Sequence, residues 1–160
     1  MSIEIERKFL VISDEYKRIG KPVRIVQGYI CSSPERVVRV RIKGDEAFIT
    51  IKDATTGFAR YEFEYQIPVA EAHQMLQCVC QQPIIDKTRW IVVAADDKVW
   101  EVDEFHADNE GLVVAEIELQ HSTDSFALPR WIGQEVTGVE RYYNACLFSN
   151  PYSQWTADLK

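Results

Sequence analysis

The chain has 160 residues, of which 46% are hydrophobic and 27% charged, and its formal net charge is −7. This size and composition are typical of a folded domain with a sizeable core, and they exclude an intrinsically disordered chain. The negative charge argues against a general binder of nucleic acid or anionic membrane, because both partners are polyanions.

The sequence contains no secretory signal pattern, in which a basic segment precedes a short apolar run. No run approaches the roughly 18 apolar residues of a membrane-spanning helix. We therefore expect a cytoplasmic protein that does not bind membranes. Its cysteines, Cys31, Cys78, Cys80 and Cys146, are then expected to be reduced rather than paired in disulfides.

Alternation of apolar and polar side chains predicts eight β-strands, because successive side chains of a strand point to opposite faces. We expect these strands at residues 3–11, 23–32, 36–43, 47–52, 60–67, 84–93, 99–105 and 112–120. Mostly short turns join them, which is typical of an antiparallel meander.

Three helices are expected among the strands. A capping signal at Ser13 and Asp14 predicts a short helix over residues 14–19, and apolar side chains at helical spacing predict a longer one over 69–81. Residues 124–133 are interpreted as a short helix interrupted by Pro129. We find no linker or repeat, so we predict a single domain over residues 1–160, with a core of about 2–150 and a tail of 151–160.

Ionisable side chains recur two residues apart along these strands, so that each set lies on one face while the opposite face is apolar. The sets are Glu4, Glu6 and Lys8; Arg39, Arg41 and Lys43; Arg60, Glu62 and Glu64; Lys87 and Arg89; Glu101 and Asp103; and Glu116 and Glu118, with Lys52 alone on its strand. Two architectures fit this pattern. Either helices cover the apolar face and the charges face water, or the sheet closes with the charges inside.

Most of these strands carry mainly one sign of charge, which favours the closed arrangement. Arginine is the preferred bidentate partner of phosphate oxygens. Clustered carboxylates are the preferred ligands of Mg²⁺ and Mn²⁺, which also bind phosphate oxygens. A cavity with one basic wall and one acidic wall would therefore suit a metal-bound polyphosphate.

These motifs resemble the CYTH superfamily, also called triphosphate tunnel metalloenzymes. The family signature E-x-E-x-K corresponds to Glu4, Glu6 and Lys8, and the other charged sets follow in the family's order from about Ile3 to Asn150. The resemblance implies a mostly β (α+β) fold, a closed eight-stranded antiparallel barrel that forms a tunnel, with helices packed on the outside.

The resemblance also implies metal-dependent hydrolysis of a triphosphate, with Mg²⁺ or Mn²⁺ as cofactor. The implied phosphate ligands are Lys8, Arg39, Arg41, Lys52, Lys87, Arg89 and Arg141. The implied metal ligands are Glu4, Glu6, Glu116 and Glu118, and Glu6 and Lys8 are the implied catalytic residues. Glu62, Glu64, Glu101, Asp103 and Tyr29 are expected to surround these groups, the four acids either as part of the site or as ion-paired supports for the basic strands.

The substrate is expected to be a small triphosphate, either inorganic tripolyphosphate or a nucleoside triphosphate. A class IV adenylate cyclase and a thiamine triphosphatase are alternatives, although Ser2 and Ile3 replace the aromatic lead usual before the cyclase signature. A non-catalytic polyphosphate- or nucleotide-binding module would not need so many carboxylates. We expect no nucleic-acid partner, and apolar outer faces make a homodimer possible.

Overall fold

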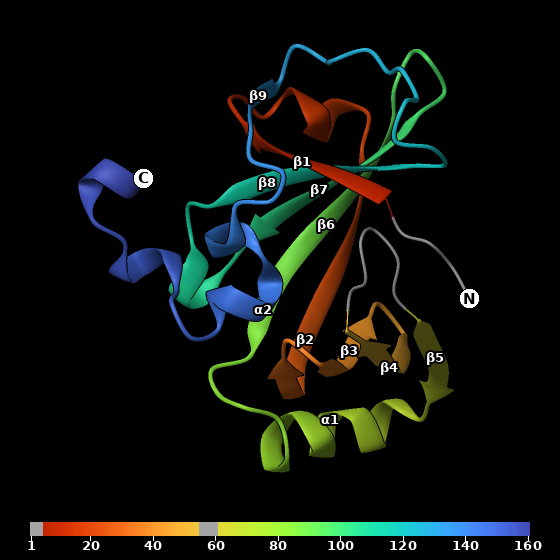
Figure 1. Cartoon of the computed structure of the whole chain (residues 1–160), viewed down its shortest axis with the longest axis vertical. Helices are drawn as coiled ribbons and strands as arrows, with labels where there is room; N and C mark the ends of the chain where they lie inside the picture. Colours follow the sequence, from red (N-terminus) through yellow and green to blue (C-terminus); the bar gives the residue numbers. More distant parts are fainter. Residues whose placement is uncertain (1–4, 55–60) are drawn as a thin grey trace. The chain divides into compact units, whose positions relative to one another are not determined.

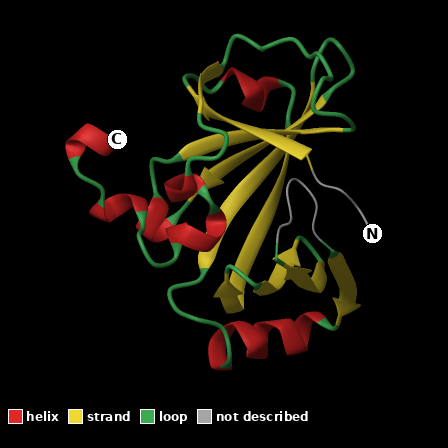
Figure 2. Cartoon of the chain, in the orientation of Figure 1, coloured by secondary structure: helices red, strands yellow, loops and turns green. Residues whose placement is uncertain are grey.

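The computed structural model describes residues 5–54 and 61–160, and strands dominate it (Figure 2). The described strands are β1 (Ile5–Val11), β2 (Lys21–Ser33), β3 (Arg36–Lys43), β4 (Glu46–Asp53), β5 (Glu62–Ile67), β6 (Ile85–Val93), β7 (Val99–Phe105), β8 (Val113–Leu119) and β9 (Ile132–Glu135). The α-helices are α1 (Val69–Cys78) and α2 (Asn144–Leu147). The 3₁₀-helices are η1 (Glu15–Arg18), η2 (Ala107–Asn109), η3 (Glu140–Tyr142), η4 (Tyr152–Gln154) and η5 (Ala157–Leu159).

Hydrogen bonding joins the strands in the order β5-β4-β3-β2-β6-β7-β8-β1-β9. The pairings with a described register are all antiparallel. The antiparallel sheet is therefore confirmed. Strands β5 and β9 stand at the two ends of this order, and no hydrogen bonds between described residues join them. Within the described residues the sheet is not closed by hydrogen bonds, so a closed barrel is not confirmed.

The chain divides into two compact units, which we describe separately. The first unit contains Arg24–Asp86, and the second contains Ile5–Val23 and Lys87–Lys160. Both internal boundaries fall inside strands, one in β2 and one in β6. The predicted single domain over residues 1–160 stays a prediction.

In the first unit, helix α1 covers the apolar face of strands β2 to β4 (Figure 1). Val40 and Ala47 are fully buried there against Ala72 and Leu76 of the helix. Gly28 permits this close approach, since a Cβ at this position would lie 2.9 Å from Cys80 Cβ. The apolar positions of these strands thus bury one face and leave the charged positions on the other.

In the second unit, the apolar face of strands β1, β6, β7 and β8 forms an aromatic core. Phe9, Trp100 and Trp131 are buried in it, and their rings meet edge to face at centroid distances of 5.5 Å and 5.8 Å. Tyr16 of η1 covers this core and is 2% exposed. Because Phe9 and Trp100 occupy the predicted apolar positions of β1 and β7, the alternation in the sequence specifies which face is buried.

The helix expected over residues 124–133 is wrong. Residues 124–129 form no helix or strand, and the final residues of the range begin β9, which the sequence did not predict. Pro129 supplies no backbone N–H for helical hydrogen bonding. The Asp124 carboxylate instead accepts hydrogen bonds from the backbone N–H groups of Gln120 and His121, which stabilises a turn.

Among the described residues, every helix is too short or too polar to span a bilayer.

Candidate functional site

Four strands of the second unit place charged side chains on the face opposite the aromatic core. The antiparallel register sets Arg89 of β6 opposite Asp103 of β7, and Glu101 of β7 opposite Glu116 of β8. Glu116 is in turn opposite Lys8 of β1. Since directly paired residues of neighbouring strands share a face, these side chains form one contiguous cluster.

Asp103 is the centre of this cluster. Its carboxylate accepts hydrogen bonds from Arg89 Nε at 2.7 Å, Arg89 Nη2 at 2.8 Å and Lys87 Nζ at 2.6 Å. Lys87 is 0% exposed and Asp103 2%. Burial acts to raise the pKa of the Asp103 carboxyl, but the Lys87 and Arg89 charges outweigh it and hold this pKa well below its ordinary value. The side chain is therefore an anion that orients two cations.

Arg89 and Lys8 each have a further carboxylate partner. Arg89 Nη1 lies 2.5 Å from Glu101 Oε2, and Lys8 Nζ lies 2.9 Å from Glu116 Oε1. Burial acts to raise the pKa of Glu116, but the charges of Lys8, Arg89 and Lys87 together outweigh it and lower this pKa. Burial likewise acts to lower the pKa of Lys8, but Glu116, Glu6 and Asp103 together outweigh it and raise this pKa. Both groups are thus charged at neutral pH.

Glu6 and Glu118 lie directly opposite one another on β1 and β8. Like charges at such positions destabilise a sheet unless a cation lies near them. Carboxylate oxygens are the donors that Mg²⁺ and Mn²⁺ prefer, so the pair fits the cofactor that the family implies. No group of three or more His, Cys, Asp or Glu side chains in the described ranges is arranged to hold a metal. Glu4, the remaining predicted ligand, lies outside the described residues.

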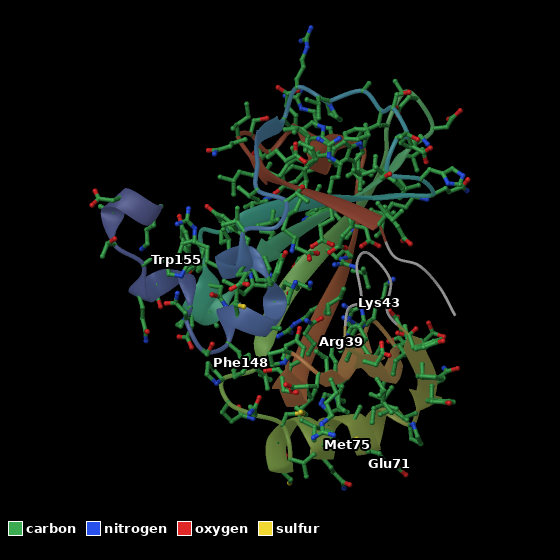
Figure 3. The ribbon with its side chains drawn as sticks, in the orientation of Figure 1. Arg39, Lys43, Glu71, Met75, Phe148 and Trp155 are labelled. Atoms are coloured by element: carbon green, nitrogen blue, oxygen red, sulfur yellow. The ribbon has the colours of Figure 1, made fainter. Side chains whose placement is uncertain are left out.

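The first unit contains a second charged face, and Arg39 lies at its centre on β3 (Figure 3). The register sets Tyr29, Arg39, Thr50 and Glu64 side by side across strands β2 to β5. Arg39 Nη2 donates to Thr50 Oγ1 at 3.4 Å, and Thr50 Oγ1 donates to Glu64 Oε2 at 2.9 Å. Lys52 Nζ lies 3.0 Å from Glu62 Oε2.

Arg41 is held by a neutral partner. Its Nε donates to Gln27 Oε1 at 3.0 Å, and Gln27 Nε2 donates to the Tyr29 hydroxyl at 3.1 Å. Gln27 is 0% exposed and Tyr29 is 4% exposed. The buried amide therefore fixes the orientation of the Arg41 guanidinium without neutralising its charge.

Arg39 and Arg141 each contain a buried donor that lacks a hydrogen-bond partner among the described residues. The Nε atoms of both side chains have no hydrogen-bond partner within the described part of the chain. Arg141 packs on the rings of Tyr142 and Trp155 at 4.9 Å and 5.4 Å, and its Nη2 donates to the Tyr142 hydroxyl. A buried donor without an acceptor costs free energy, which an anionic ligand would offset.

The four flanking acids, Glu62, Glu64, Glu101 and Asp103, each lie within 4 Å of a predicted phosphate ligand. This geometry is what ion-paired supports for the basic strands require, and their roles stay predictions. Sequence reasoning missed the neutral partners Thr50 and Asn144. Asn144 accepts a hydrogen bond from Lys87 at 3.0 Å, a contact between residues 57 positions apart. No local motif in the sequence indicates it.

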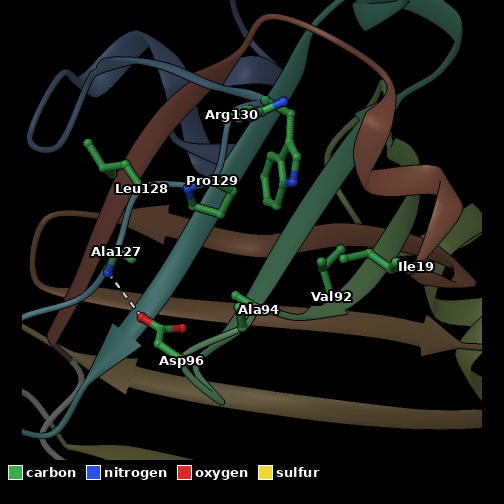
Figure 4. Close-up of a pocket in the computed structure, with 10 residues that line it drawn as sticks. Ile19, Val92, Ala94, Asp96, Ala127, Leu128, Pro129 and Arg130 are labelled. Carbon is green, nitrogen blue, oxygen red and sulfur yellow. Dashed lines mark hydrogen bonds between the residues drawn. The ribbon is translucent and has the colours of Figure 1, made fainter.

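An apolar pocket of about 290 Å³ lies elsewhere in the second unit (Figure 4). Ile19, Val92 and Trp131 contribute to its lining, and the Asp96 carboxylate accepts a hydrogen bond from the Ala127 N–H at its rim. None of the predicted site residues lines it. A lining with Arg130 as its one cation, among the described residues, does not suit a triphosphate.

Comparison with known proteins gives consistent matches. The family model of the CYTH domain matches residues 2–143. An inorganic triphosphatase of Acetivibrio thermocellus is 46% identical over 155 residues, which are 97% of this chain and 99% of that protein. An inorganic triphosphatase of Nitrosomonas europaea is 34% identical over 148 residues, 90% of this chain and 95% of the relative.

A solved structure extends the similarity to the fold. The crystal structure of the inorganic triphosphatase NE1496 superposes with a TM-score of 0.69 and 32% identity, and covers 92% of this chain and 95% of that one. Together, the fold and the charged faces define a class of antiparallel β protein whose sheet presents paired cations and carboxylates. The chain belongs to the CYTH domain family.

Proposed function

We propose that this chain hydrolyses inorganic triphosphate and requires Mg²⁺ or Mn²⁺. The observation that carries the proposal is the pair of buried arginine Nε donors, at Arg39 and Arg141, that have no acceptor in the described residues. Such donors suit a polyanion, because a guanidinium binds phosphate oxygens through charge-assisted hydrogen bonds. The relative with 46% identity, an inorganic triphosphatase, supports the choice of substrate.

Each unit has its own proposed phosphate ligands. Those of the first unit are Arg39, Arg41 and Lys52, and those of the second are Lys8, Lys87, Arg89 and Arg141. Phosphoryl transfer requires from a protein mainly positioning and neutralisation of charge. Asp103 keeps Lys87 and Arg89 in fixed directions, so these two cations need little reorganisation when a phosphate binds.

Glu4, Glu6, Glu116 and Glu118 would hold the divalent cation, which supplies positive charge against the phosphate oxygens. Glu6 orients the attacking water and can accept its proton. The water oxygen forms a bond to a terminal phosphorus while the bond from that phosphorus to the bridging oxygen breaks. The products are phosphate and pyrophosphate, and Lys8 stabilises the charge that develops.

The test is to incubate the purified protein with tripolyphosphate, ATP or thiamine triphosphate, each with Mg²⁺ or Mn²⁺. Release of phosphate from tripolyphosphate without formation of cyclic AMP from ATP is the expected result. Cyclic AMP as the main product would establish a cyclase instead, and preference for thiamine triphosphate would establish a thiamine triphosphatase. Tight binding of tripolyphosphate without turnover would show a non-catalytic module.

Site variants refine this test. We expect Glu4→Gln and Glu116→Gln to abolish turnover, because each removes a carboxylate charge from the proposed cation ligands. Lys43→Ala serves as the control, since Lys43 follows the basic set on β3 but has no assigned role. Full activity of Glu116→Gln with Mg²⁺ present would contradict the proposed ligand set.

A further inference from the structure

We infer that Asn144 is a positioning residue, whose side-chain oxygen fixes the direction of the Lys87 ammonium towards a bound phosphate. This inference rests on the proposed function, because it assumes that Lys87 binds phosphate. It adds to that function a neutral side chain from the C-terminal part of the chain, outside all the charged motifs of the strands.

The geometry around Lys87 carries the argument. Its Nζ donates to Asp103 Oδ2 at 2.6 Å and to Asn144 Oδ1 at 3.0 Å. A lysine ammonium has three donors on a flexible stem, so one acceptor alone leaves it free to rotate. Two acceptors on separate elements, β7 and α2, set its direction.

Asn144 does not perform the usual task of an asparagine near a helix start. It is the first residue of α2 and not its N-cap, which is Tyr143, and Tyr143 makes no side-chain capping hydrogen bond. Its oxygen is committed to a lysine 57 positions away instead. A role in helix capping therefore does not explain this contact.

The same short segment also contacts the other buried lysine of the cluster. Lys8 Nζ donates to the Tyr142 carbonyl at 3.3 Å and lies 5.1 Å from the centre of the Tyr143 ring. Residues 142–144 thus supply uncharged partners to two ammonium groups that we assign to phosphate binding.

The neutrality of Asn144 matters for the charge of the cluster. Lys8, Lys87 and Arg89 already have carboxylate partners in Glu116, Asp103 and Glu101. A further carboxylate at position 144 would still accept the hydrogen bond, but it would add a negative charge beside Lys87 that repels a polyanion. An amide orients Lys87 without this repulsion.

Two variants and a matched control separate these effects. In Asn144→Ala, we expect kcat/KM for tripolyphosphate to fall about tenfold or more, because a hydrogen bond to a charged group is lost. In Asn144→Asp, we expect mainly KM to rise, since the acceptor remains and the charge changes. Ser149→Ala removes a hydroxyl that lies just after α2 and donates to the Cys146 carbonyl within it, and this variant should behave like the unmodified protein.

A double-mutant cycle shows whether Asn144 acts through Lys87. When Lys87→Met is already present, adding Asn144→Ala should change kcat/KM less than about twofold, because the partner is gone. If Lys87→Met does not fold, Lys87→Leu, which also lacks a donor, replaces it. If turnover is too low to measure, the cycle uses the rise in melting temperature caused by tripolyphosphate with Mg²⁺. Full multiplication of the two single effects would overturn the inference.

The outcomes distinguish this inference from the proposed function. If the unmodified protein neither binds nor hydrolyses tripolyphosphate, the proposed function fails and the inference fails with it. If the unmodified protein is active while Asn144→Ala equals Ser149→Ala in kcat and KM, the inference alone is overturned.

Discussion

Asp103 accepts hydrogen bonds from two buried cations at once, so it affects the free energy of unfolding more than an exposed acid does. Removing one partner of a buried ion pair leaves the other charge uncompensated in a medium of low dielectric constant. The carboxylate therefore links stability to function, because the side chains that it stabilises are two of the proposed phosphate ligands.

Asp103→Asn should lower the free energy of unfolding at pH 7 by about 3–5 kcal/mol, since Lys87 and Arg89 lose the carboxylate they share. Urea unfolding followed by circular dichroism measures this change. Asp86→Asn is the control, because Asp86 pairs with the exposed Arg24 and such a pair contributes about 1 kcal/mol or less. Equal losses in the two variants would contradict the role assigned to Asp103.

The depressed pKa of Asp103 also predicts how stability depends on pH. A carboxyl whose pKa is lower in the folded than in the unfolded state contributes stability fully above the unfolded value, about 3.9. That contribution is lost as the pH falls through the folded value. The unfolding free energy, measured from pH 6 down to pH 2.5, should decline below about pH 4. Asp103→Asn should show a shallower decline, and parallel curves would contradict this assignment.

At the scale of single residues, alternation in the sequence correctly grouped the charged side chains on one face of each strand. It could not predict their partners. Glu116 pairs with Lys8, and Glu62 pairs with Lys52, because the strand register sets them together. Register depends on turns and on long-range packing as well as on alternation. Local sequence patterns therefore could not predict the neutral partner Asn144 either.

Helix α1 illustrates how one element depends on the absence of a side chain in another. Gly28 of β2 lies beneath it, and a Cβ there would lie 2.9 Å from Cys80 Cβ and 3.1 Å from Leu76 Cδ2. Leu76 is 3% exposed and Cys80 is 8% exposed, so neither has room to move aside. Overpacking of this kind forces a shift of the helix itself.

Gly28→Ala should therefore destabilise the chain by about 1–3 kcal/mol. Gly133→Ala is the matched control in β9, because the added Cβ would mainly meet the Cγ2 methyl group of Ile12, a side chain that is 69% exposed. We expect the control to cost clearly less, as the exposed side chain can rotate away. Thermal and urea unfolding of both variants measure the difference, and an equal or larger loss at Gly133 would contradict the tight packing of α1.

At the scale of elements, the sequence predicted each of the eight long strands and helix α1 to within a few residues. Their signals are repeated alternation and a run of helical spacing, which tolerate local exceptions. The helix prediction for the region before β9 was wrong for a physical reason. Trp131 is buried in the aromatic core and Pro129 breaks helical hydrogen bonding, so tertiary packing determines the conformation there. With four residues, β9 is too short to show a period.

At the scale of the whole molecule, the two units share strands rather than a linker. The boundaries fall between Val23 and Arg24 in β2, and between Asp86 and Lys87 in β6. A strand that continues through a boundary couples the residues on either side of it. The sequence likewise contains no flexible linker, which is why we predict a single folding domain.

We therefore expect one cooperative unfolding transition. All four tryptophans, at positions 90, 100, 131 and 155, belong to the second unit, so tryptophan fluorescence reports that unit. Cys80 is buried in the first unit, and the rate of its reaction with a thiol reagent reports that one. Coincident urea midpoints from the two probes would support a single domain, whereas separate midpoints would contradict it. Cys78→Ser removes the exposed neighbouring thiol, which would otherwise obscure the signal.

Closure of the barrel is the part of the architecture that the alternation in the sequence could not predict. Alternation states which side chains share a face, but it contains no information on whether the first and last strands of a sheet meet. Closure depends on strand tilt and stagger, which arise from the whole sheet. The family resemblance implied a closed tunnel. The hydrogen-bonded strand order of the described residues confirms an antiparallel sheet but does not confirm its closure.

The buried amide of Gln27 has a consequence for how the chain responds to acidity. An amide gains or loses no proton in ordinary buffers, so the hydrogen bond that it accepts from Arg41 is the same in mildly acidic and in alkaline solution. Arg89 differs, because its hydrogen-bond partner is the Asp103 carboxylate, which strong acid can protonate. The two contacts thus differ in their tolerance to acid. The hydrogen bond from Arg41 to Gln27 should persist at a pH at which protonation of Asp103 weakens its contacts with Arg89.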